Sequence, residues 1–310
     1  MAFKDIMNNY FYGKQGKADM TVADLPANRL ELFGAVLKVR WSSLVGLNLL
    51  YLVIWIPAII WTVMNLVLMN GMQLNEEVTY ANEDFLNVIS MWLLVLWPCI
   101  AITGPFNAGI TYVLRNWARD QHSFVLSDFW DAVKGNWKQA LPVSFISGAL
   151  PFLVFIGVQF YSDLAKASPI FMLPVALLVL AAVIWSMMTM LMYVLMVTYE
   201  LKLRDVIRNA LLLTIGRLPF ALLFKLLTLA LPILAAALIR LLPGAAQYIL
   251  LGLTLLYFVF MVAFNKLITV SYANWLCETF MNTRIEGAAT NIGLRPENWD
   301  DTEYRPEDDE

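Results

Sequence analysis

The sequence predicts an all-α, polytopic membrane protein with about six transmembrane helices and cytoplasmic amphipathic helices at the interface. The chain has 310 residues, of which 60% are hydrophobic and 15% charged, and its mean hydropathy is +0.66. A soluble domain typically carries about 25% charged residues. The charges are also clumped, because five windows, each longer than the roughly 20 residues that cross a bilayer as a helix, contain none at all: 41–75, 85–114, 139–162, 167–199 and 241–265.

A further apolar stretch holds Lys225 and Arg240 close to its ends, where both side chains can extend to an interface. With it we expect six spans, near 43–69, 86–114, 141–162, 169–199, 219–242 and 247–275. Together they form a transmembrane domain over residues 43–275. Residues 1–42 are expected to be a cytoplasmic segment with an amphipathic helix. Residues 276–310 are expected to form an acidic cytoplasmic tail without fixed structure.

The distribution of Lys and Arg predicts the orientation. If the spans are placed as above, 19 of the 21 basic residues fall on the side of the two termini, and only Lys166 and Arg240 fall on the other. Basic loops stay in the cytoplasm, so both termini should be cytoplasmic. We expect a multi-pass protein of the bacterial plasma membrane. The first 42 residues contain no apolar core, so no cleavable signal is expected and the first span should act as its own insertion signal.

Three half-polar segments precede cytoplasmic entries into the membrane: 28–44, 126–141 and 203–218. With the proline that follows each of the last two, residues 126–142 read LSDFWDAVKGNWKQALP and residues 203–219 read LRDVIRNALLLTIGRLP, with Leu-x-Asp and Leu-Pro at the same spacing. Their apolar residues recur at steps of three and four, which is typical of an amphipathic helix. Each helix should lie along the interface and turn at Pro142 or Pro219, which suits the first turn of the next span. The hairpins 126–199 and 203–275 would then form a weak parallel repeat.

These segments admit two interpretations. They are either simple elbows of re-entry or a cytoplasmic docking surface for a partner. Their spacing resembles the coupling loop of ABC-importer permeases, although the Ala-Ala and Gly of that loop are missing here. The docking hypothesis rests on seven residues of the two segments: Asp128, Trp130, Trp137, Lys138, Asp205, Arg208 and Arg217.

The usual chemistry of enzymes is absent from the sequence. His122 is the only histidine, so neither a Ser-His-Asp set nor a His or Cys pair with metal-ligand spacing can be built. No phosphate-binding Gly-rich loop is present. We therefore expect no enzyme, no cofactor and no metal site. None of the expected spans contains Asp or Glu, which disfavours a self-contained ion-coupled transporter. Cys99 and Cys277 are expected to be reduced thiols.

Two features inside the membrane could contact a solute. The second span breaks at Gly104-Pro105 and continues with Asn107, and a bend of this kind frees backbone carbonyls. It is equally explained as a structural kink. Aromatic rings can stack on sugars but also form interfacial belts. Four tryptophans lie in the first two spans: Trp55, Trp61, Trp92 and Trp97.

Residues 26–58 and 102–140 resemble the YesL-like family of bacterial membrane proteins. The resemblance is carried by the Leu-Asn-Leu-Leu of the first span and by Gly104, Pro105 and Ala108-Gly109, followed by Tyr112 and a final Asn136. The family is without a settled activity, and its members look like companions of carbohydrate-uptake ABC systems. The resemblance thus implies a sugar-utilisation context and supplies no catalytic residues.

Three hypotheses follow. The first is a non-enzymatic membrane protein that assists carbohydrate uptake by docking on the permease or ATPase of an ABC-type importer. The second is a permease-like protein that itself moves a neutral solute, such as a carbohydrate, by means of Asn48, Asn107 and Asn265. The third is a structural or sensory membrane protein. Each has the lipid bilayer as a partner, and no nucleic-acid partner is expected.

Overall fold

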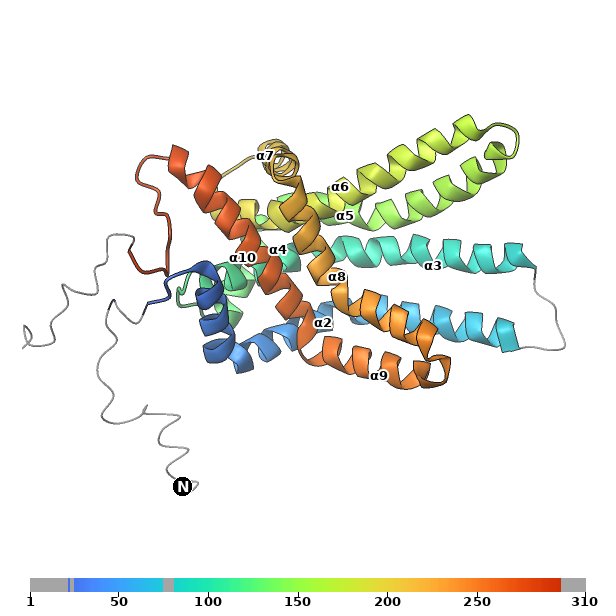
Figure 1. The fold of residues 1–310 in the computed structure, drawn as a ribbon, viewed down its shortest axis with the longest axis horizontal. Helices are drawn as coiled ribbons and strands as arrows, with labels where there is room; N and C mark the ends of the chain where they lie inside the picture. The colour runs from blue at the N-terminus through green and yellow to red at the C-terminus, as the bar shows by residue number, and fades with distance from the viewer. Residues whose placement is uncertain (1–21, 23–24, 75–80, 297–310) are drawn as a thin grey trace, which may run out of the picture.

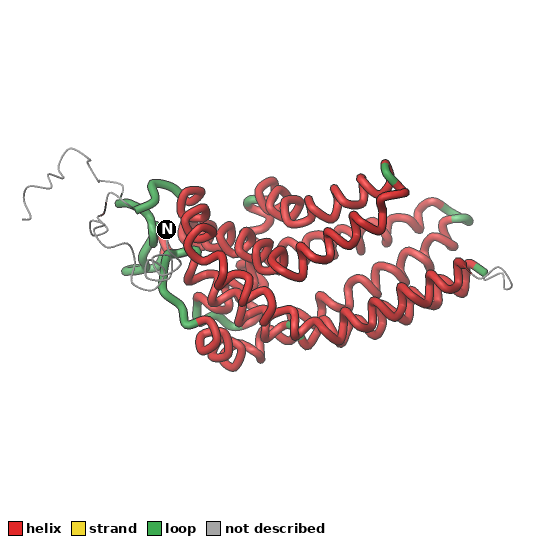
Figure 2. Tube along the Cα trace, turned by 90° about the horizontal axis from the view of Figure 1, so that it is seen from below, coloured by secondary structure: helices red, strands yellow, loops and turns green. Residues whose placement is uncertain are grey.

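The computed structural model describes residues 22, 25–74 and 81–296, and this part of the chain is helical, with no strand in it (Figure 2). Within it, six helices are long and apolar enough to cross a membrane. The all-α, six-span prediction is therefore confirmed. The longer elements are α2 (Arg29–Leu74), α3 (Asn82–Ile102), α4 (Gly104–Trp117), α5 (Val125–Ala165), α6 (Met172–Thr198), α7 (Leu203–Gly216), α8 (Leu218–Leu241), α9 (Ala246–Leu256), the π-helix η4 (Tyr257–Met261) and α10 (Val262–Phe280).

Three helix pairs extend in the same direction from one end of the molecule (Figure 1). They are α2 with α3, α5 with α6, and α8 with α9, and the connections within the last two pairs lie at the right of that view. The helices α4, α7 and α10 fill the other end, where the pairs converge. Side chains of Ile60, Leu66, Leu180 and Leu234 on the pairs are about half exposed or more. An apolar surface of this extent matches the lipid-facing side of a membrane protein.

α2 begins with an amphipathic stretch that ends in a kink at Arg40, whose φ of −109° and ψ of 19° are not helical. Before the kink, Leu32 and Val36 are buried while Leu30 is exposed. After it, the apolar span runs to Leu74 in a different direction (Figure 1). The structure thus has the expected break between a half-polar helix and the first span.

The elbow expected before the fifth span is also present. α7 ends at Gly216, Arg217 has a φ of −131° and a ψ of 39°, and α8 follows with Pro219 in its first turn. The elbow expected at Pro142 is wrong, because α5 runs unbroken from Val125 to Ala165 with that proline inside it. The two hairpins of the expected repeat therefore differ in their entry.

Close packing by α4 explains why α5 stays continuous. A Cβ placed on Gly109 would lie 2.8 Å from Val133, and one placed on Gly104 would lie 2.5 Å from the carbonyl oxygen of Ala140. α4 thus rests on α5 on both sides of Pro142. Gly148 packs in the same way against the backbone of Trp97 in α3, beyond the proline. These contacts compensate for the hydrogen bond that proline removes from a helix.

The second and sixth spans also differ from the expected ranges. The range 86–114 is divided at Thr103 into α3 and α4, and only α3 has the length and composition of a span. The range 247–275 is interrupted by η4, at which the chain bends between α9 and α10 (Figure 1).

Of the expected acidic tail, 297–310 lie outside the described residues, whereas Asn291 and Arg295 contact the folded part through their backbone amides.

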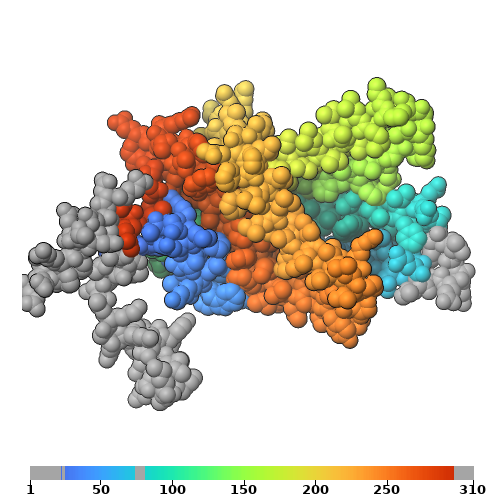
Figure 3. Space-filling model, in the orientation of Figure 1, coloured from blue at the N-terminus to red at the C-terminus, as the bar shows by residue number. Residues whose placement is uncertain are grey.

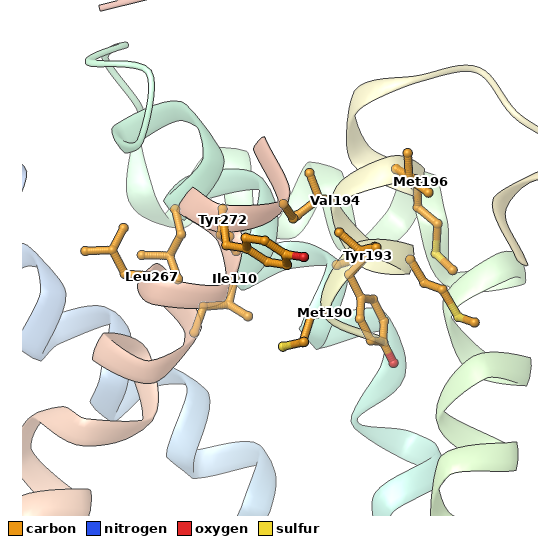
Figure 4. Packing of buried hydrophobic residues seen from close by; sticks show 14 of the residues in the cluster. Ile110, Met190, Tyr193, Val194, Met196, Leu267 and Tyr272 are labelled. Atoms are coloured by element: carbon orange, nitrogen blue, oxygen red, sulfur yellow. The ribbon is translucent and has the colours of Figure 1, made fainter. Parts of the chain in front are cut away.

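The hydrophobic core lies where α4, α6 and α10 meet. Ile110 of α4 and Leu267 of α10 are fully buried, and Tyr193 and Val194 of α6 are 5% exposed or less. Figure 4 shows side chains of the three helices pointing toward one another, with Tyr272 of α10 reaching toward α6. This packing holds together the end of the molecule from which the three pairs extend.

Candidate solute-binding cavity

A cavity of about 610 Å³ lies between the helix pairs, in the membrane-spanning part of the chain. Figure 3 shows a hollow in this region, between α8 and the α5/α6 pair, with α3 at its floor. Every span contributes to the wall, and many of the contributions are polar. The lining residues are Tyr51, Leu52, Trp55, Ile59, Ile100, Thr103, Asn107, Ser144, Ser147, Thr189, Met190, Tyr193, Lys225, Thr228, Tyr257, Val262, Asn265, Lys266 and Thr269.

Asn107 is the centre of a hydrogen-bond network on the wall of the cavity. Its Oδ1 accepts a hydrogen bond from the hydroxyl of Tyr51 at 2.8 Å and another from Nζ of Lys266 at 3.3 Å. Its amide donates to the carbonyl and hydroxyl oxygens of Thr103, each at 3.3 Å. Asn107 therefore links the α3/α4 junction to α2 and α10.

Lys266 places its ammonium group against the aromatic face of Tyr193, with 4.7 Å between Nζ and the ring centroid. The ring is almost fully buried in α6. A cation over a tyrosine face gains about 0.5 to 2 kcal/mol, more when water is excluded. The ring and Asn107 give Lys266 two neutral partners.

Lys225 is the second lysine of the cavity. Its Nζ donates to the carbonyl oxygen of Ser186 at 3.4 Å, which is long for a hydrogen bond. One turn further along α8, the carbonyl of Thr228 accepts a hydrogen bond from the Asn265 amide at 3.3 Å. That amide also lies 3.4 Å from the hydroxyl of Tyr257. The α8 and α10 sides of the cavity thus present polar groups held by weak contacts.

The four tryptophans of the first two spans differ in their hydrogen bonding. The indole N–H of Trp61 donates to the carbonyl of Trp92, and that of Trp92 donates to the hydroxyl of Thr62. Trp97 donates to the carbonyl of Phe145. These three indoles therefore hold the helix pairs together. Trp55 lines the cavity, and its buried N–H finds no acceptor of hydrogen-bond geometry in the described chain.

The bend at η4 is held by Asn48 of α2. A π-helix displaces the regular i to i−4 ladder and leaves carbonyl groups to be satisfied by other donors. The Asn48 amide donates to the carbonyls of Tyr257 at 3.2 Å and Phe258 at 2.7 Å. Its Oδ1 accepts from the backbone N–H of Ala263 at 2.9 Å. Asn48 therefore supports the wall without lining the cavity.

Of the residues expected from the sequence to contact a solute, only some line the cavity. Asn107 and Asn265 line the cavity. Gly104 and Pro105 do not, since both are buried at the start of α4 and a Cβ on Gly104 would meet the Ser144 side chain. The glycine and proline thus shape the bend, and the asparagine one turn later faces the cavity.

Sequence reasoning missed Lys225 and Lys266 as site residues, because it placed Lys225 at the interface and counted Lys266 only among the basic residues of the cytoplasmic side. A signal was present for Lys266. It is the only charged residue between Arg240 and Glu278, and an asparagine precedes it. A lysine so far from other charges marks membrane depth. For Lys225 the sequence gives no such signal, and only the structure shows that it lines the same cavity as Lys266.

The seven proposed docking residues lie on α5, α7 and the turn after α7. Trp130, Trp137 and Lys138 are exposed, and Nζ of Lys138 lies 5.8 Å from the Trp137 ring centroid. Asp128 accepts hydrogen bonds from Ser123 and the backbone of Phe124. In the second segment Arg208 is exposed. Asp205 and Arg217 are partly buried.

A separate polar cluster closes the end of the bundle away from the helix pairs. Glu278, 3% exposed, forms an ion pair with Arg29 and lies 3.6 Å from Arg119. Asn274 donates to Glu278 and accepts from Arg119 at 2.7 Å. Burial of the guanidinium group of Arg115 lowers its pKa to about 10. This cluster ties the start of α2 to the end of α10, and the described residues hold no group of His, Cys, Asp and Glu suited to a metal.

Fold and cavity together define a polytopic helical membrane protein with a polar cavity between its spans. Residues 35–158, less than half of the chain, match a family described as "Protein of unknown function, DUF624". That range covers α2 from Ala35 onward, α3, α4 and most of α5, and so includes one wall of the cavity. No curated protein and no solved structure matches the chain.

Proposed function

We propose that this chain is a non-enzymatic, permease-like membrane protein that binds a polar solute in the cavity between its spans. The observation that carries the proposal is the convergence of polar groups from α2, α4, α5, α6, α8 and α10 on one cavity. Polar and ionisable groups at membrane depth are unfavourable without a partner and therefore mark ligand or ion paths. A pocket of about 300–1,000 Å³ suits a small molecule.

We also propose its setting. The end that holds α4, α7 and the C-terminal half of α10 faces the cytoplasm of a bacterium, and the three helix pairs cross the plasma membrane. The support is the excess of Lys and Arg on that end. In this orientation the kink at Arg40 and the elbow at Arg217 lie at the cytoplasmic interface.

Thiol labelling tests whether the cavity is open to a polar solute. Thr228→Cys places a thiol on the cavity wall, and Leu227→Cys places one on a neighbouring, exposed apolar position of the same helix that does not line the cavity. Both are made in a chain with Cys99 and Cys277 replaced by alanine. In intact membranes, membrane-impermeant methanethiosulfonates of either charge should modify position 228 and spare 227. If neither reagent modifies position 228, the proposal fails.

A second candidate function is an accessory role in carbohydrate uptake, as a docking partner of an ABC-type importer. The observation that favours it is the exposed aromatic and basic surface of Trp130, Trp137 and Lys138. Exposed Trp is typical of interface hot spots. Affinity purification from the native membrane should recover a permease or ATPase subunit, and Trp130→Ala with Trp137→Ala should lose it. Recovery of no transport component would remove this candidate.

A further inference from the structure

We propose that the solute group held in the cavity is an oxyanion, a phosphate or carboxylate, bound between Lys225 and Lys266. This inference rests on the proposed solute-binding function and specifies the chemistry of its ligand. The two lysines stand on α8 and α10 and line the same cavity. Among the described residues, no Asp or Glu lines that cavity with them.

Several hydrogen-bond donors on the cavity wall have few or distant acceptors among the described residues. An ammonium group carries three N–H donors. Lys266 has one acceptor, Asn107 Oδ1 at 3.3 Å, which also accepts from Tyr51. Among the described residues, Lys225 has one distant carbonyl, and the indole N–H of Trp55 has no acceptor in hydrogen-bond geometry. A ligand that supplies acceptors without donors would satisfy these groups, and an oxyanion is such a ligand.

The charge balance leads to the same ligand class. Two cations removed from water are unfavourable unless an opposite charge is paired with them. The Tyr193 ring offers Lys266 only a partial compensation. A neutral sugar could use Asn107, Asn265 and the hydroxyls of the wall, but it would leave both ammonium groups without a counter-charge.

The remaining wall indicates where the rest of the ligand would lie. Leu52, Ile59, Met190 and Val262 give the cavity an apolar portion beside the lysines. The hollow of Figure 3 opens on the side of the molecule, between α8 and the α5/α6 pair. Two sources share the required chemistry, namely the head group of an anionic lipid and a water-soluble phosphate ester.

The charge preference of labelling at position 228 tests the inference. The measured quantity is the ratio of the labelling rate with an anionic methanethiosulfonate to the rate with a cationic one. In the Thr228→Cys chain this ratio should be about tenfold higher than for free cysteine. Lys225→Met and Lys266→Met should each reduce this ratio toward that of free cysteine, while Lys166→Met, at an exposed site, should not. Lys266→Arg keeps the charge and should retain the preference, so a general loss of folding can be recognised.

Protection from labelling identifies the source of the anion. In nanodiscs, replacing phosphatidylcholine in part by phosphatidylglycerol should slow labelling if the ligand is a lipid head group. Glucose 6-phosphate in solution should slow labelling if the ligand is a soluble ester. Glucose should leave the labelling rate unchanged, whichever of the two sources is correct. A ratio of rates equal to that of free cysteine, or protection by glucose, would overturn the inference while leaving solute binding intact. Absence of labelling by either reagent would remove solute binding as well.

Discussion

Asn48 donates a hydrogen bond to the backbone carbonyl of Tyr257, 209 positions later in the chain, at a distance of 3.2 Å. The bond joins α2 to the π-helix at which α9 turns into α10. Tyr257 itself lines the cavity, and Lys266 follows two turns later. The position of the lysine therefore depends on a bend that a distant asparagine stabilises.

Replacing Asn48 by alanine should lower the free energy of unfolding by about 1–3 kcal/mol, because two carbonyls and one N–H lose their partner. The measurement is thermal unfolding in detergent. Asn65→Ala is the matched control on the same helix, since within the described residues Asn65 donates to the carbonyl of Trp61 in its own helix. Equal shifts of the unfolding temperature in the two variants would show that Asn48 does not hold the bend.

Gly104→Ala should destabilise the protein by about 1–3 kcal/mol through overpacking, because its Cβ would overlap Ser144 and the carbonyl of Ala140. Gly135→Ala on α5 is the control, since a Cβ there meets no atom within 4 Å. That substitution should be neutral or stabilising, as alanine favours a helix by about 1 kcal/mol over glycine. Unfolding midpoints measured side by side decide the matter, and a stable Gly104→Ala would refute the close packing of α4 on α5.

Glu278→Gln should loosen the first turns of α2, since Arg29 and Arg119 lose the carboxylate between them. Removing one partner of a buried ion pair costs about 3–5 kcal/mol, and Arg29 is only partly buried, so the lower end is expected. Hydrogen exchange of residues 29–40 should increase. Glu286→Gln, at an exposed position, should leave it unchanged. Unaltered exchange in Glu278→Gln would contradict the role of this cluster.

Tyr193→Leu should weaken the hold on the ammonium of Lys266, whereas Tyr193→Phe keeps the ring and should preserve it. The loss of a cation–π contact worth about 0.5–2 kcal/mol corresponds to roughly two- to thirtyfold in an equilibrium. The readout is the charge preference of labelling at position 228. A preference that survives in the leucine variant would mean that the ring does not position the lysine.

The number of spans followed from the sequence because long charge-free windows leave few other structures open to the chain. The elbows before the spans were predicted from the sequence only in part. The pattern before Pro142 and that before Pro219 are alike, yet the structure breaks only at Arg217. Contacts of Gly109, Gly104 and Gly148 with α5 and α3 decide the difference, and such contacts join segments that are distant in the sequence.

The site was predicted less completely. Asn107 could be singled out near the bend because a polar group inside an apolar span is visible in the sequence, and in the structure it lines the cavity. Lys225 was assigned to the interface and Lys266 to the cytoplasmic side, since a lysine in a sequence does not reveal whether its side chain extends to water or into a cavity. The π-helix at Tyr257–Met261 carries no local signal, because its stability depends on Asn48 of another helix.

The central claim is that Lys225 and Lys266 hold an anionic group inside the membrane. The most direct measurement is a cryo-EM map of the chain in nanodiscs that contain phosphatidylglycerol, with glucose 6-phosphate in the buffer. Density is expected within hydrogen-bond distance of both Nζ atoms, and none at that place in a Lys225→Met, Lys266→Met double variant. An empty cavity in the wild-type chain, or the same density in the double variant, would contradict it.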